Sequence, residues 1–197
     1  MVQVPKQATP AAPAAQAPAT GASSDAVRAP LLSRVIGGID PAHRFFLIDL
    51  GGLRSATLDR MQAFRCRLDI LDFDIGILKQ DRGEGALGAM QARLAERLPD
   101  AGGEFADLLL CWNYLNYFSR AEITTLMEVI LPRLSERAQI HALVESSSPD
   151  MASTPAPLAL AEDGFVRVGG AAHEAPGSPR LAAPRHSTDG LLACMPG

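Results

Sequence analysis

The amino-acid sequence predicts an α/β fold built on an open, mostly parallel β-sheet with flanking helices. Apolar runs at residues 45–50 and 106–112 contain few polar residues, which is typical of strands buried on both faces of a sheet. Segments with helical periodicity separate these runs, so strand and helix signals alternate through the middle of the chain. Such alternation indicates parallel strands joined by right-handed helical crossovers.

The start of the chain contributes a polar tail, two short helices and one strand. Residues 1–24 are rich in Ala, Pro, Gln, Thr and Ser, and we expect them to be disordered because this composition buries too little apolar surface to offset chain entropy. A short helix with Asp25 as its candidate cap is expected over residues 24–37, where Gly37 and Gly38 end it. The next expected elements are a buried strand at 45–50 and a helix at 54–62.

The middle of the chain contributes two strands and one helix. A half-exposed strand is expected at 64–71, because apolar residues alternate there with Arg65, Arg67 and Asp69. A helix is expected at 84–98, and the buried strand at 106–112 follows it. The apolar stripe of this helix consists of Leu87, Met90, Leu94 and Leu98.

The helix after residue 118 has the clearest signals in the chain. Ser119 and Glu122 form a capping box, in which each side chain pairs with a backbone N–H at the start of the helix. Pro132 is expected to kink or shorten the last turn, and a strand is expected at 138–144. The apolar face of the helix consists of Ile123, Leu126, Met127, Ile130, Leu131 and Leu134.

Together these elements predict a Rossmann-like sheet, reduced in strand number, within a domain spanning residues 25–145. Only residues 73–78 offer a candidate for a remnant of the strand that would follow the one at 64–71. Residues 146–197 are expected to form a loop-rich extension with a small hairpin at 158–168 and a helical turn near its end.

Composition excludes several classes of partner and compartment. The formal net charge is −4 and no Lys/Arg cluster is present, which argues against a nucleic-acid partner. No apolar run approaches the roughly 20 residues that cross a bilayer, so no membrane association is expected. Cys66, Cys111 and Cys194 are widely spaced and form neither a disulfide framework nor a Cys-x-x-Cys motif, which fits a reducing cytoplasm.

The stretch "FFLIDLGGLRS", residues 45–55, predicts a ligand site after the first buried strand. Ligands of open parallel sheets bind outside the carboxyl ends of the strands. Gly51 and Gly52 would let the backbone approach a ligand there, and Asp49 adds a carboxylate at the strand end. An ordinary turn is the alternative interpretation of the two glycines.

Two further features fall at the ends of neighbouring strands. Asp69 and Asp72 follow Gly51 at about the distance at which a carboxylate binds a ribose diol in such sheets. The stretch "CWNYLNYF", residues 111–118, crowds aromatic rings and Asn amides after the strand at 106–112, where rings would cover a planar ligand. The alternatives are a solvated pair of carboxylates and aromatic packing under the capped helix.

These stretches resemble the class I S-adenosylmethionine-dependent methyltransferases. Residues 45–55 resemble the first motif of that family, and residues 106–118 resemble its fourth strand and the loop after it. The resemblance covers roughly residues 44–145 and implies S-adenosylmethionine as the cofactor and methyl transfer to an unknown small-molecule or protein acceptor. It assigns Asp49, Gly51 and Gly52 to the methionine pocket, Asp72 or Asp69 to the ribose and Trp112 to the cofactor, and it places the catalytic residues Asn113 and Tyr114 beside the methyl group and the acceptor.

The sequence departs from the family pattern in three places. Leu53 and Ser55 stand where the family has its second and third loop glycines, the third strand is rudimentary, and no terminal pair of antiparallel strands follows the strand at 138–144. The last departure would leave that strand as an open edge through which the chain could self-associate. The alternative function is therefore a degenerate methyltransferase fold that acts as a noncatalytic interaction module.

Other common chemistries lack their motifs. The sequence contains no Gly-x-Ser-x-Gly elbow and no phosphate-binding P-loop. Its four histidines show no metal-ligand spacing, and His141 is expected to be a core residue rather than a ligand.

Overall fold

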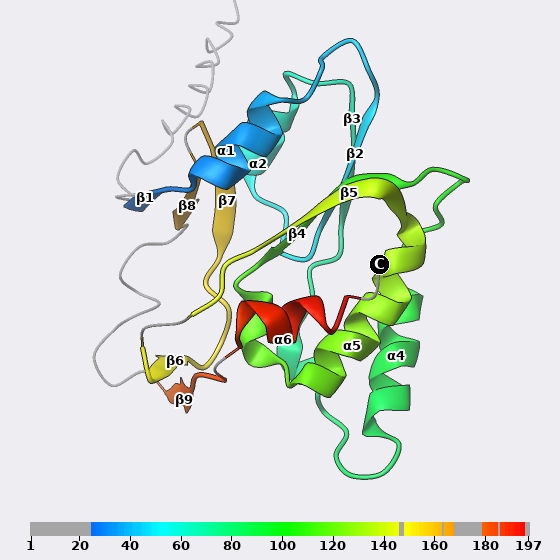
Figure 1. Ribbon diagram of the computed structural model, residues 1–197, viewed down its shortest axis with the longest axis vertical. Coiled ribbons are helices and arrows are strands. Elements are labelled where there is room, and N and C mark those ends of the chain that lie inside the picture. Colours follow the sequence, from blue (N-terminus) through cyan, green and yellow to red (C-terminus); the bar gives the residue numbers. More distant parts are fainter. Residues whose placement is uncertain (1–24, 146–147, 163, 168–178, 185, 196–197) are drawn as a thin grey trace, which may run out of the picture.

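The computed structural model describes residues 25–145, 148–162, 164–167, 179–184 and 186–195. The expected disorder of residues 1–24 lies outside this part of the chain. The predicted α/β class is confirmed: four parallel strands form a sheet in the order β3-β2-β4-β5, flanked by helices (Figure 1). The strands are β2 (Phe45–Asp49), β3 (Cys66–Ile70), β4 (Ala106–Trp112) and β5 (Leu134–Ala142).

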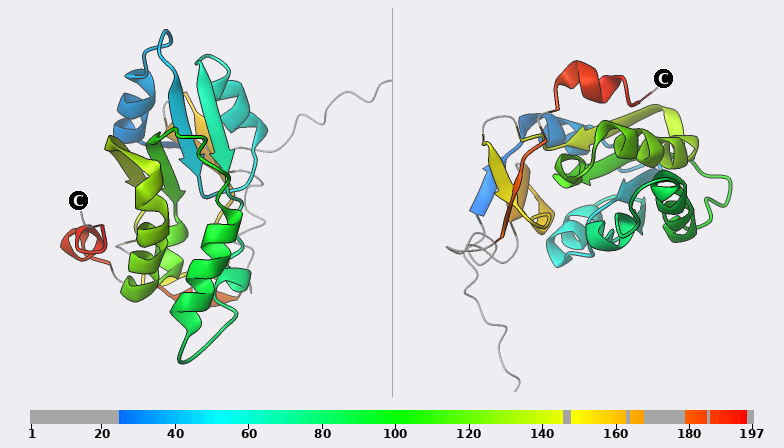
Figure 2. Two further views of the ribbon diagram at one scale, coloured as in Figure 1. Left: turned by 90° about the vertical axis from the view of Figure 1, so that its right-hand side faces the viewer. Right: turned by 90° about the horizontal axis from the view of Figure 1, so that it is seen from below.

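Helices cover both faces of the parallel sheet. The connections β2–α2–β3 and β4–α5–β5 run in opposite directions across the sheet, so right-handed crossovers put α2 and α5 on opposite faces (Figure 2). Helix α5 packs side by side with α4, and α2 packs against β7. The helices are α1 (Pro30–Gly37), α2 (Ser55–Met61), α3 (Ile75–Leu78), α4 (Ala86–Arg97), α5 (Arg120–Ile130) and α6 (Thr188–Leu192), with the short 3₁₀ helices η1 (Tyr114–Tyr117) and η2 (Leu131–Arg133).

Strand β4 and helix α5 match the sequence-based predictions most closely. Strand β4 covers the predicted residues, and all but one of its seven residues are buried. The capping box is present: the Ser119 hydroxyl accepts a hydrogen bond from the Glu122 backbone N–H, and the Glu122 carboxylate accepts one from the Ser119 backbone N–H. Helix α5 ends before Pro132, which lies in the 3₁₀ turn η2.

Two expected elements have a different structure. The helix expected at 24–37 begins only at Pro30, because residues 25–28 form strand β1 (Asp25–Arg28) and pair antiparallel with β8 (Gly164–Arg167). Residues 73–78, the candidate strand remnant, instead contain helix α3, whose first turn is capped by the Asp74 carboxylate.

The burial predicted for two other elements is partly wrong. In β3, Asp69 was expected on the exposed face, but its side chain is only 9% exposed because it pairs with Arg67. In α4, Met90 and Leu94 are buried as predicted, whereas Leu87 is 42% exposed.

Strand β5 starts at Leu134, earlier than predicted, because a bulge inserts extra residues into it. Ala106 of β4 pairs with Leu134, whereas Leu108 pairs with Gln139. The extra residues leave residues 135–138 outside the regular ladder. Strand β5 forms the edge of the parallel sheet and pairs only with β4 among the described strands.

The end of the chain joins the same core. The expected hairpin is confirmed as β7 (Leu158–Ala161) and β8, which form a small antiparallel sheet with β1. Leu160 and Phe165 of this hairpin are buried in one hydrophobic cluster with β2 and β4. A second pair of short strands consists of β6 (Asp150–Ala152) and β9 (Arg180–Ala182).

Candidate functional site

The strand order brings three loops together at the carboxyl ends of the strands. Strand β2 lies between β3 and β4. The chain runs from β2 to β3 on one side of β2 and then crosses back to β4 on its other side, so the strand order reverses between β2 and β4. Backbone hydrogen bonds continue past the strand ends: Leu50 N–H donates to Leu110 O (3.0 Å) and Leu71 N–H donates to Asp49 O (2.8 Å). We call the loop residues 49–54, 71–74 and 112–114 the carboxyl edge.

Asp49 is the buried centre of this edge. Its side chain is 2% exposed, and its Oδ1 accepts hydrogen bonds from the Gly51 backbone N–H (2.7 Å) and from Nε1 of Trp112 (2.6 Å). Burial raises the pKa of the Asp49 carboxyl to about 6, against the opposing effect of these two hydrogen bonds. Asp49 therefore ties the glycine loop to the end of β4.

Trp112 is held beneath the glycine loop. Its backbone is left-handed, with φ of 48°, and its side chain is 1% exposed. Its ring makes an edge-to-face contact with Phe165 of β8, with centroids 6.2 Å apart. The structure therefore buries the indole against the glycine loop and the C-terminal hairpin.

Neighbouring side chains lie close to both glycines. A Cβ atom at position 51 would lie 3.0 Å from Cδ1 of Trp112, and one at position 52 would lie 2.6 Å from Oδ1 of Asp72. Leu53, which stands at the position of a family glycine, is 58% exposed.

Asp72 lies at the carboxyl edge beside Gly52. It has a left-handed backbone, with φ of 44°, a conformation that Asp and Asn adopt more readily than most residues. Its backbone N–H donates to Gly51 O (3.2 Å), and its side chain is exposed. A carboxylate in this position remains accessible to a ligand that lies over the glycine loop.

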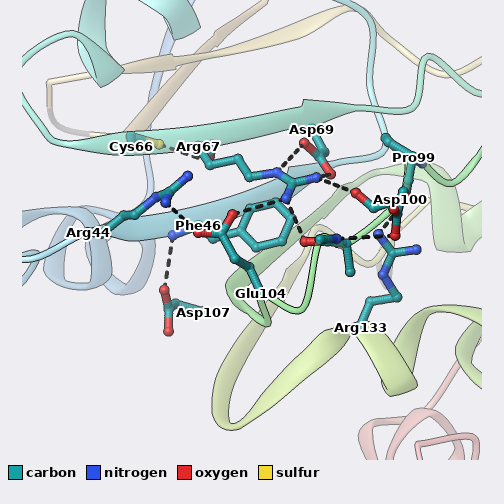
Figure 3. Close-up of polar contacts among 12 residues, drawn as sticks. Arg44, Phe46, Cys66, Arg67, Asp69, Pro99, Asp100, Glu104, Asp107 and Arg133 are labelled. Carbon is teal, nitrogen blue, oxygen red and sulfur yellow. Dashed lines mark hydrogen bonds and ion pairs between the residues drawn. The ribbon is translucent and has the colours of Figure 1, made fainter.

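Asp69 occupies a different environment (Figure 3). Its two oxygens accept from Nε (3.0 Å) and Nη2 (2.9 Å) of Arg67, whose other N–H groups donate to Ala101 O, to Glu104 and to Asp100 O. These last partners precede β4, so they lie at the amino ends of the strands. Asp69 is therefore paired with Arg67 and faces away from the carboxyl edge.

Asn113 and Tyr114 follow Trp112 at the carboxyl edge. The Oδ1 atom of Asn113 is buried and accepts no hydrogen bond from the described residues. The Tyr114 side chain is 8% exposed, and burial together with the nearby charges of Asp72 and Asp49 raises the pKa of its phenol to about 12. Both residues directly follow Trp112, whose ring packs against Gly51.

Three residues at or beside this edge were given no role of their own in the sequence analysis, although Asn116 lies within the stretch 111–118 that it singled out. Asn116 fixes η1 to the end of β5, because its Nδ2 donates to Leu143 O (2.8 Å) and its Oδ1 accepts from Glu145 N–H (2.9 Å). Arg54 adds a positive charge near Asp49, and Asp74 adds a third carboxylate. The Asp-x-Asp spacing of residues 72–74 was the available signal for Asp74.

Several classes of site find no support in the described residues. No group of three or more His, Cys, Asp or Glu side chains in this part of the chain is arranged to hold a metal ion. None of the described helices has the length and apolar character to cross a membrane. The Nδ1 atom of His141, expected to be a hydrogen-bonded core atom, is buried without a hydrogen bond to a described residue, and burial lowers the His141 pKa.

No protein-family model, curated protein or solved structure matches the chain. Its function must therefore be inferred from the geometry of the carboxyl edge.

Proposed function

We propose that the chain is a Rossmann-like, S-adenosylmethionine-dependent methyltransferase that binds its cofactor at the carboxyl edge. The reversal of strand order between β2 and β4 is the observation that carries this proposal. In open α/β sheets, ligands bind outside the carboxyl ends of the strands at such a reversal. The glycine loop, the Asp72 loop and the Trp112 loop all lie at this position.

The residues present fit the cofactor at the loop and at the ribose. The hydrogen bond from Gly51 N–H to Asp49 orders the loop, and Gly52 allows the Asp72 carboxylate to lie against the backbone. An exposed carboxylate beside the loop offers two acceptor oxygens for the hydroxyl groups of a ribose. We therefore assign the ribose to Asp72 rather than to Asp69, whose oxygens pair with Arg67.

Asn113 and Tyr114 are assigned to the acceptor side of the site. When bound, the cofactor supplies an electrophilic methyl group, and the protein contributes mainly by aligning the acceptor with it. The Oδ1 of Asn113, which has no hydrogen-bond partner among the described residues, is suited to accept a hydrogen bond from that acceptor. The Tyr114 phenol, which is protonated at neutral pH, is suited to donate or accept one.

Titration calorimetry of the full chain with S-adenosylmethionine and S-adenosylhomocysteine tests the proposal. We expect micromolar binding that weakens about tenfold or more in Asp72→Ala, because an unpaired ribose diol costs roughly 1–3 kcal/mol. Asp72→Asn, which retains a residue suited to the left-handed backbone, separates loss of the carboxylate from a change of loop conformation. Asp59→Ala, at an exposed position of α2, is the matched control. Absence of heat at millimolar concentrations of both ligands, from protein shown to be folded, would refute the proposal.

The alternative is a noncatalytic interaction module, and the position of Trp112 favours it. The indole contacts the glycine loop from within the core and packs against Phe165, so one side of the loop is already occupied.

An interaction module could also self-associate by pairing the β5 edges of two chains. The regular part of that edge is short, because the bulge at 135–138 interrupts it and exposes Glu136 and Arg137. Sedimentation of the chain over a range of concentrations measures whether its molecular mass rises with concentration, as self-association requires.

A further inference from the structure

The Asn116 side chain joins the end of β4 to the end of β5. Its Nδ2 donates to Leu143 O (2.8 Å) and to Asn113 O (3.1 Å). Its Oδ1 accepts from Glu145 N–H (2.9 Å), and the residue is 4% exposed. These partners fix the orientation of the amide, because its donor faces two carbonyl oxygens and its acceptor faces an N–H group.

The hydrogen bonds of Asn116 continue the β4–β5 ladder past the end of β4. The last regular step of the ladder is at Trp112, whose carbonyl oxygen accepts from Leu143 N–H (2.7 Å). In a parallel ladder the next residue of β4 to pair would be Tyr114, which would donate to Leu143 O and accept from Glu145 N–H. The Asn116 amide makes both of these bonds instead. One side chain thus takes the place of one peptide unit of β4.

This replacement frees the main chain after Trp112 to leave the sheet. Residues 114–117 turn into η1 instead of continuing β4. The bond from Asn116 to Asn113 O ties the same amide to the start of this turn. Asn113 and Tyr114, which the proposed function assigns to the acceptor side of the site, therefore leave the sheet at a position that Asn116 sets.

We propose that Asn116 is a positioning residue of the site, whose amide stands in for the peptide of Tyr114 and holds Asn113 and Tyr114 at the carboxyl edge. The inference rests on the proposed function and adds to it a residue that touches no ligand. A side chain that cannot both donate and accept here would leave buried backbone groups of β5 without partners. The segment 112–117 is then expected to move.

Asn116→Asp tests the positioning role, because protonation of the introduced carboxyl group decides whether the bonds form. An ionised carboxylate still accepts from Glu145 N–H, but its second oxygen faces Leu143 O and Asn113 O, which repel it. A protonated carboxyl group donates from that oxygen and restores the bond to Leu143 O. The effect of the substitution should therefore be large at pH 7.5 and small at pH 4.5, where a buried carboxyl group is mostly protonated.

Titration calorimetry of the full chain with S-adenosylmethionine gives the first readout. At pH 7.5 we expect Asn116→Asp to weaken binding about tenfold or more, as for a buried group left without its partner. At pH 4.5 the affinity should return to within about threefold of that of the wild-type chain. The variant and the wild-type chain are compared at each pH, so the titration of all other groups cancels to first order. Ile130→Val, in the core at the carboxyl end of α5, lowers stability and should leave the affinity unchanged.

The NMR signal of the Trp112 indole N–H gives a second readout that needs no ligand. Trp112 is the single tryptophan of the chain, and its Nε1 donates to Asp49 (2.6 Å). If the segment 112–117 moves, the difference in this signal between Asn116→Asp and the wild-type chain should follow the protonation of the introduced carboxyl group. A role confined to stability would lower the free energy of unfolding and move neither readout of the folded chain.

The outcomes separate this inference from the proposed function. An affinity ratio that is the same at both pH values, or close to one at pH 7.5, would overturn the positioning role and leave the cofactor site standing. Absence of binding by the wild-type chain would overturn the proposed function. An indole signal that is then the same in both chains at both pH values would overturn the positioning of the segment as well.

Discussion

Asp49→Asn provides the sharpest test of the structure at the candidate site. The Asp49 carboxylate is buried, and burial raises its pKa from the ordinary value of 3.8 to about 6. The amide of Asn keeps an oxygen that can accept from Gly51 N–H and from Nε1 of Trp112, but it carries no charge. The substitution therefore removes the cost of ionising a buried group and keeps its hydrogen bonds.

The sign and size of the effect follow from the pKa. A group whose pKa is raised in the folded state binds more protons when folded, so its contribution to stability falls as the pH rises from about 4 to 6. At about 1.4 kcal/mol for each pKa unit, the ionised Asp49 carboxylate destabilises the native state by about 3 kcal/mol at pH 7.5. At pH 4.5 the same relation gives a destabilisation of the native state of about 1 kcal/mol. The stability gained by Asp49→Asn should thus grow by about 2 kcal/mol between these pH values.

Urea unfolding followed by the fluorescence of Trp112, the single tryptophan of the chain, measures this difference. The wild-type chain and the variant are compared at each pH, so the titration of all other groups cancels to first order. Asp59→Asn, exposed on α2, is the control and should change the free energy of unfolding by less than about 0.5 kcal/mol. A pH-independent difference, or a variant less stable than wild type at pH 7.5, would refute the reasoning. If the ionised carboxylate serves ligand binding, the more stable variant should also bind S-adenosylmethionine more weakly.

Two further predictions concern the scaffold. In Gly164→Ala, the new Cβ would lie 2.3 Å from Val27 O and 2.5 Å from Ala29 N, which are backbone atoms, so thermal unfolding should reveal a loss of about 1–3 kcal/mol. Gly88→Ala in α4, where a Cβ would meet nothing within 4 Å, should instead stabilise the chain by about 0.5–1 kcal/mol, and equal effects of the two substitutions would contradict the β1–β8 pairing. Ser119→Ala removes one half of the capping box and should cost about 1 kcal/mol in urea unfolding, and no measurable change would show that the cap contributes little to α5.

Local sequence determined the elements whose signals lie within a few residues. The capping box predicts the start of α5, the apolar run at 106–112 predicts β4, and "LGGL" predicts the turn after β2. These predictions depend on backbone preferences and on periodic burial, which a short segment expresses by itself. The same local signals place Asp49, Asp72 and Trp112 at or just after the ends of strands.

Tertiary contacts decided the rest, because the deciding partners are distant in sequence. Residues 25–28 form a strand because β8, near the other end of the chain, supplies its hydrogen bonds. Asp69 and Asp72 are equivalent by spacing, but Arg67, which pairs with Asp69, is held in place by Ala101 O and Glu104, 34 and 37 residues further along the chain. Phe165, 53 positions after Trp112 in the sequence, packs against its indole, and Trp112 in turn donates to the buried Asp49, 63 residues away. The spacing of apolar residues in a segment predicts which of its residues are buried. The identity of the neighbours that bury them depends on how the chain folds back on itself.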